Sequence, residues 1–130
     1  MGQAEVVCEF DDSNMFDGFA LDSEGGAWIT TLISNRLWYV DPIGRPNLII
    51  EDSEPSHIAQ LCAHQRSVDG VPKDFIYLER NSTLRNISSV AFGSDDLSTV
   101  YMGSLMGESL YSFRSPVAGF KPAQWEFGPF

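Results

Sequence analysis

One carboxylate in this sequence stands outside the β-strand pattern that follows it. Asp17 precedes Gly18, after which Phe19 and Leu21 have the period-2 spacing of a strand. Glycine lets a ligand approach the backbone closely, so a carboxylate at the mouth of this strand is the leading candidate for a site. The alternative is a loop carboxylate that accepts hydrogen bonds from nearby backbone N–H groups.

The histidines and cysteines are the other side chains that could do chemistry. His57 and His64 lie seven residues apart on a similar face of an expected helix, with Cys62 between them. Nothing places an orienting carboxylate beside the histidines, so packing at a surface or interface is favoured over a metal or catalytic role. We expect Cys62 and Cys8 to be separate thiols. With no nucleophile elbow, phosphate loop or dinucleotide fingerprint, the catalytic residues stay unassigned.

Composition narrows the class of protein. The 130 residues suffice for one domain with a real core, and 18 acidic against 8 basic residues give a net charge of −10. Lys and Arg are not clustered, which argues against phosphate-driven nucleic-acid binding. The acidity favours solubility, or else a weak preference for cations. Apolar runs such as residues 48–50 are too short for a bilayer, and residues 1–5 lack signal-peptide features. We therefore expect a cytoplasmic protein that binds no membrane.

Short segments rich in aromatic and β-branched residues, bounded by Gly, Pro, Asn and Asp, predict strands along most of the chain. These segments are residues 5–10, 18–22, 26–31, 36–41, 47–51, 87–92, 99–103, 109–113 and 123–127. Residues 52–85 interrupt them. A helix is expected to start there with Ser53 as cap and Pro55 in the first turn. Residues 75–78 are either a further strand or part of this insertion.

The strands on either side of the insertion look like copies of one another. The matched segments are residues 19–22 and 90–93, 27–30 and 100–103, and 37–39 and 110–112. Repeated units with glycine turns and aromatic third strands are typical of β-propeller blades. We predict an all-β partial β-propeller domain over residues 1–130. It has two four-stranded antiparallel blades at about 16–51 and 86–128, an extra N-terminal strand, and a partly helical insertion at 52–85.

The repeat also suggests where a site would lie and what would complete it. Asn86 and Ser88 begin the inner strand of the second blade, near the position that matches Asp17. They are candidates to line the same channel, and the alternative is hydrogen bonding within a turn. Two blades cannot close a ring of typically 4 to 8 blades. We therefore expect a homo-oligomer or a complementary propeller fragment to bury the remaining apolar faces, with an open two-blade sandwich as the alternative.

Four segments carry a resemblance to a known family. Residues 16–30 are similar to the "PDG" block of the senescence-marker-protein/gluconolactonase/luciferin-regenerating-enzyme family, which continues as a strand, a glycine turn and a tryptophan strand. Residues 36–44 resemble its following "R-V-x-R-x-D-P-x-G" strand, and residues 84–97 resemble its next-blade block. Residues 114–119 are similar to a closing segment of one bacterial branch. The resemblance is to the C-terminal part of a family member.

This resemblance implies a six-bladed propeller that holds a divalent metal, commonly calcium, and hydrolyses lactones or related esters. The metal-binding aspartate of the family falls on Asp17, and Phe16 replaces the usual proline. The family's other ligands, a glutamate and an asparagine, belong to regions outside this sequence. The expectation is a lactonase-like hydrolase of a small molecule if an assembly completes the site. The alternative is a non-catalytic interaction module.

Overall fold

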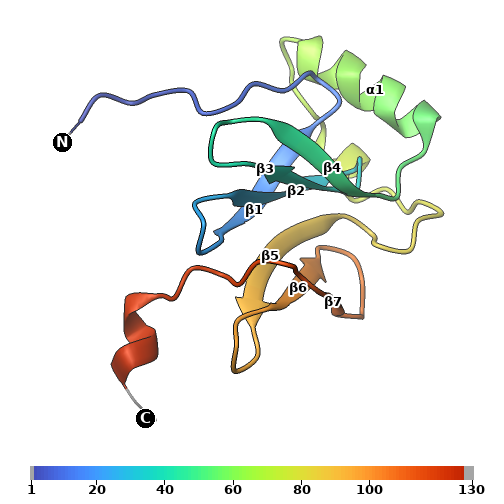
Figure 1. The fold of residues 1–130 in the computed structure, drawn as a ribbon. Helices are drawn as coiled ribbons and strands as arrows, with labels where there is room; N and C mark the ends of the chain where they lie inside the picture. Colours follow the sequence, from blue (N-terminus) through green and yellow to red (C-terminus); the bar gives the residue numbers. More distant parts are fainter. Residues whose placement is uncertain (1, 128–130) are drawn as a thin grey trace.

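The computed structural model describes residues 2–127, which form two antiparallel β-sheets (Figure 1). Sheet 1 contains, in spatial order, β1 (Met15–Leu21), β2 (Ala27–Leu32), β3 (Arg36–Val40) and β4 (Pro46–Glu51). Sheet 2 contains β5 (Ile87–Gly93), β6 (Thr99–Ser104) and β7 (Tyr111–Arg114). Both sheets are meanders, in which each strand pairs with the next along the chain, and this confirms the mostly β prediction.

Aspartates organise the turns of sheet 1. Asp22 Oδ1 accepts a 2.8 Å hydrogen bond from the Gly26 N–H, and Asp41 Oδ1 accepts a 2.9 Å bond from the Arg45 N–H. Each side chain thus spans its own turn and satisfies backbone donors that the strands leave free. Asp22 also accepts a 3.1 Å bond from Trp28 Nε1, which joins the β1–β2 turn to the core.

The core lies between the two sheets. Trp28 and Leu37 of sheet 1 are buried against Val90, Val100 and Met102 of sheet 2. The first strands of the two sheets, β1 and β5, are in contact along this interface. Burial of these side chains is the main stabilising contribution available to a domain of this size.

The insertion is partly helical, as predicted. It contains α1 (Pro55–Arg66) and α2 (Lys73–Ile76), so residues 75 and 76 are helical and the strand alternative was wrong. A second apolar cluster joins it to sheet 1 through Leu61, Phe75 and Ile33. Pro55 occupies the first turn as expected, but the N-cap of α1 is Glu54, without a side-chain hydrogen bond. No helix within residues 2–127 has the length and apolar character needed to cross a membrane.

Two predicted strands are not formed. Residues 123–127 belong to a 3₁₀ helix, η1 (Ala123–Phe127), so sheet 2 has three strands where four were expected. The chain leaves β7 and returns to the β1–β2 turn, where the Phe120 N–H donates a 2.9 Å bond to the Leu21 carbonyl. Residues 5–10 are not a strand either, because no neighbouring strand offers them a ladder. The two sheets form no closed barrel or ring within residues 2–127.

Candidate functional site

Asp17 and Gly18 form a β-bulge in the first strand. The pairing of β1 with β2 is regular on either side, but its register shifts between Phe16 and Phe19. Thr30 compensates for the shift: its Oγ1 accepts a 3.1 Å bond from the Gly18 N–H and donates a 3.1 Å bond to the Gly18 carbonyl. Bulges redirect side chains and are common beside functional sites. Here Asp17 is exposed, at the point where the strand bends.

Gly18 is the point of close approach between the two first strands. A Cβ on Gly18 would lie 2.5 Å from the Ser88 carbonyl oxygen and 2.9 Å from Ser89 Cα. The register of β5 also shifts, between Ile87 and Ser89. The bulges of β1 and β5 therefore adjoin, and the structure brings Asp17 and Ser88 to the same junction.

Asn86 has a different position from Ser88. It is buried and has a positive φ of 64°. Its Oδ1 accepts a 3.0 Å bond from the Ile33 N–H, and its Nδ2 donates a 2.7 Å bond to the Ile76 carbonyl. Its own N–H donates a 2.7 Å bond to Asn35 Oδ1. The Asn86 amide is thus engaged inside the fold, where it links sheet 2 to the β2–β3 turn and to α2.

The donor set around Asp17 does not form a calcium site by itself. The hollow beside this carboxylate is otherwise lined by Cys8, Phe10, Phe16, Phe19 and Ile29. Across residues 2–127, no three side chains of His, Cys, Asp or Glu gather in the manner of metal ligands. Calcium takes about 6 to 8 oxygen ligands, and a single carboxylate supplies one or two of them.

The two histidines of α1 have separate neighbours. His57 Nδ1 lies 3.4 Å from a carboxylate oxygen of Glu54, one turn earlier. The His64 ring packs on Phe75 with a centroid distance of 4.7 Å. Neither contact resembles a catalytic pair, because the His57–Glu54 contact lies at the start of α1 and no nucleophile accompanies it in the described contacts.

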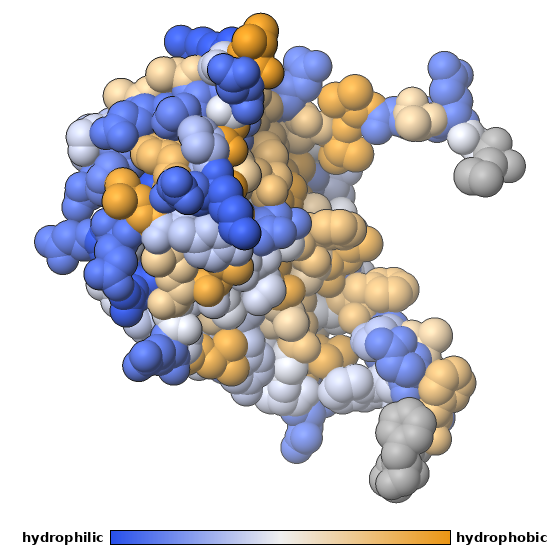
Figure 2. Space-filling model, turned by 180° about the vertical axis from the view of Figure 1, so that it is seen from behind, coloured by the Kyte–Doolittle hydropathy of each residue, from blue (hydrophilic) through white to orange (hydrophobic). Residues whose placement is uncertain are grey.

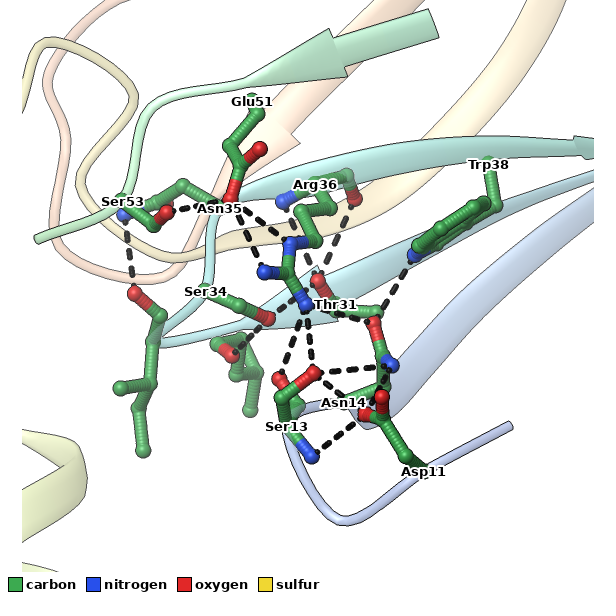
Figure 3. A network of polar contacts seen from close by, with 12 residues as sticks. Asp11, Ser13, Asn14, Thr31, Ser34, Asn35, Arg36, Trp38, Glu51 and Ser53 are labelled. Atoms are coloured by element: carbon green, nitrogen blue, oxygen red, sulfur yellow. Dashed lines mark hydrogen bonds and ion pairs between the residues drawn. The ribbon is translucent and has the colours of Figure 1, made fainter. Parts of the chain in front are cut away.

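A polar network that the sequence did not reveal surrounds Arg36 (Figure 3). Arg36 contacts Glu51 Oε1 through Nε at 3.0 Å and Nη2 at 2.9 Å, and its Nη1 donates a 2.7 Å bond to Ser13 Oγ. Asn14 Oδ1 accepts a 2.9 Å bond from Trp38 Nε1 and a 3.3 Å bond from Arg36 Nη1. The network therefore fastens the loop before β1 to strands β3 and β4. No local sequence signal marks it, because its members lie in three separate segments of the chain, residues 11–14, 31–38 and 51–53.

Hydrogen bonding lowers the pKa of two carboxylic acids in this network. The Ser53 hydroxyl and the Arg36 guanidinium hold the pKa of Glu51 below its usual range, with Ser53 the larger cause. The Ser13 hydroxyl and N–H do the same for the pKa of Asp11. Because these groups already bond to one another, we interpret the network as structural.

The largest unexplained feature is the face of sheet 1 that points away from sheet 2. Directly opposed residues of paired strands share one face, and the pairing therefore places two apolar rows across the sheet. These rows are Phe19, Ile29, Trp38 and Leu48, then Leu21, Ala27, Val40 and Pro46. We call this surface the open face. None of its eight residues is charged, and Phe19 is 67% exposed.

The N-terminal segment covers the open face only in part. Phe10 packs on Trp38 and Phe16, with ring centroids 5.2 and 4.8 Å apart, while Val6 and Val7 are exposed. A hollow of about 380 Å³ remains between this segment and the sheet. Figure 2 shows hydrophobic side chains gathered on the concave side of the molecule, between the projecting N-terminal segment and the C-terminal region.

The corresponding outer face of sheet 2 has a different character. Its residues are small or polar: Ser89, Ala91, Gly93, Thr99, Tyr101, Gly103, Ser112 and Arg114. Only one face of sheet 2 is therefore apolar, and that face is already buried against sheet 1. Comparison with protein-family models and with curated proteins finds no match to this chain.

Proposed function

We propose that this chain is a non-catalytic interaction module that docks a β-sheet of a partner chain on the open face of sheet 1. The observation that carries the proposal is that sheet 1 has apolar rows on both faces while sheet 2 covers only one face. Sheets with two apolar faces are normally covered on both sides. Extended exposed apolar patches commonly mark interaction sites.

The shape and charge of the open face support a sheet as its occupant. Stacked sheets pack about 10 Å apart through interdigitating apolar side chains, and two cross-strand apolar rows suit that arrangement. The net charge of −10 makes the rest of the surface repel acidic partners, whereas the eight residues of the open face carry no formal charge. The neighbouring row on the same side of the sheet contains the Arg36–Glu51 ion pair, whose charges compensate each other. The family resemblance implies a neighbouring propeller blade, and such a blade would present the apolar sheet surface that fits the open face.

A metal-dependent lactonase-like hydrolase is the second candidate. The exposed position of Asp17 on the β1 bulge, beside the junction with Ser88, is the observation that favours it. Since one carboxylate does not make a calcium site, a partner would have to supply the other oxygen ligands. Calorimetric titration of the assembled protein with calcium tests this candidate. Identical binding by wild type and Asp17→Asn would exclude Asp17 as a ligand.

Paired substitutions on the two outer faces test the interaction module. We expect Phe19→Ser combined with Leu21→Ser to reduce both the binding of a hydrophobic dye and any concentration-dependent increase in mass. Ala91→Ser, on the outer face of sheet 2, should leave both unchanged. Dye fluorescence and sedimentation velocity provide the measurements, with circular dichroism to confirm folding. Equal dye binding and equal association of the two variants would contradict the proposal.

A further inference from the structure

Sheet 2 has a free edge where sheet 1 has a fourth strand. In the described part of the chain, β7 pairs with β6 on one side and with no strand on the other. Residues 115–120, which follow β7, do not cover this edge, because they return to the β1–β2 turn. Unpaired N–H and C=O groups along a sheet edge are a template for another strand.

The same chain contains an extended segment that lacks a sheet. Residues 5–9 make no backbone hydrogen bond within residues 2–127, and Val6 and Val7 are 76% and 71% exposed. In an extended conformation Val6 and Cys8 point to one side, and Glu5, Val7 and Glu9 point to the other. One side is therefore wholly apolar and the other carries both carboxylates, as on a strand that is buried on one face only.

The two sides of this segment match the two faces of β7. On β7, Tyr111 and Phe113 face the core, whereas Ser112 and Arg114 face outward. A strand added to this edge would continue the apolar face with Val6 and Cys8. The side that carries Glu5 and Glu9 would lie beside Arg114, whose side chain is 68% exposed and also pairs with Asp96 at 2.8 Å. Opposite charges on neighbouring strands are favourable.

A second copy is the occupant because a chain cannot fill its own edge with this segment. Phe10 is held against Phe16 and Trp38, and the segment leaves over sheet 1 on the side opposite sheet 2 (Figure 1). Every copy therefore has one strand to donate and one edge to receive it. We infer that residues 5–9 of one copy add to the β7 edge of a second copy and complete its sheet 2. Exchange of identical elements between copies is an economical route to association.

Proline substitution tests this inference without disturbing the core. Proline removes a backbone donor and fixes φ, and neighbouring residues of a strand point their N–H groups to opposite sides. Val6→Pro combined with Val7→Pro therefore removes at least one ladder bond. Gly2→Pro combined with Gln3→Pro, outside the donated strand, is the matched control. The measurements are sedimentation velocity and amide hydrogen exchange over a wide range of protein concentration.

We expect the mass of wild type and of the control to rise with concentration, while amide exchange in Tyr111–Arg114 slows at least about tenfold. The Val6→Pro/Val7→Pro variant should stay monomeric, with fast exchange in β7. Three results would overturn the inference: a monomeric wild type at every concentration, undiminished association of the Val6→Pro/Val7→Pro variant, or association that leaves exchange in β7 unchanged. In the last case, a loss of association on Phe19→Ser would point to the open face instead.

Discussion

Sheet 1 and sheet 2 have the same topology but differ in strand number and in the character of their outer faces. Each is an antiparallel meander with a bulged first strand, and both contribute to one core. Sheet 1 has four strands and apolar rows on both faces, whereas sheet 2 has three strands and one apolar face. Under the proposed function, sheet 1 is a middle layer and sheet 2 is an end layer with a free edge at β7.

The largest expected effect separates the covered face of sheet 1 from its open face. Trp28 is 4% exposed and packs against Tyr39, Phe92 and Phe113. We expect Trp28→Ala to lower the free energy of unfolding by about 3–5 kcal/mol, because it leaves a cavity between the sheets. Trp38→Ala, on the open face, should cost about 1–2 kcal/mol. Urea unfolding measures the free energy of unfolding of both variants. Equal losses would contradict the distinction between a covered and an open face.

A smaller effect tests the junction of the two first strands. We expect Gly18→Ala to lower the free energy of unfolding by about 1–3 kcal/mol, because its Cβ would lie 2.5 Å from the Ser88 carbonyl oxygen and force β1 and β5 apart. Gly2→Ala is the control, since a Cβ there would meet nothing within 4 Å. Chemical denaturation of the two variants makes the comparison. Equal stability would show that the strands do not approach as closely as described.

The smallest effect concerns the acid stability of sheet 2. Hydrogen bonds from Ser94, from the Ser98 N–H and from Arg114 lower the pKa of Asp96 from 3.8 to about 2. A lowered folded-state pKa stabilises the fold above pH 3.8, and this contribution disappears as the pH falls towards 2. We therefore expect Asp96→Asn to reduce the loss of stability between these pH values. Thermal unfolding at several pH values measures how steeply stability falls with pH. The same pH dependence in wild type and Asp96→Asn would contradict the lowered pKa of Asp96.

Local sequence patterns were sufficient to predict the fold where segments that are neighbours in the sequence pair with one another. The strands of sheet 1 and the start of α1 at Pro55 depend on residues close in sequence. Asp17 was expected ahead of the first strand, but it lies within β1, which begins at Met15. The bulge was not recognisable from the sequence, because it depends on the Thr30 side chain of the opposite strand.

The sequence could not show features that depend on distant partners. Residues 5–10 and 123–127 have strand-like composition, but composition does not supply a neighbouring strand. The link between Asn35 and Asn86 joins residues 51 positions apart. The Arg36 network likewise connects the loop before β1 with β4. The repeat predicted two equivalent blades, each with a further apolar face to bury, whereas sheet 2 has only one apolar face.

Hydroxyl-radical footprinting tests most directly whether sheet 1 is a middle layer with one face uncovered. In the dilute protein, Phe19 should be oxidised readily, while Trp28 is protected by sheet 2. When a partner chain docks on the open face, Phe19 and Leu21 should become protected and the reactivity of Trp28 should not change. Protection of Phe19 in the dilute monomer, or continued oxidation of Phe19 in the assembled protein, would contradict the assignment of this face as a docking surface.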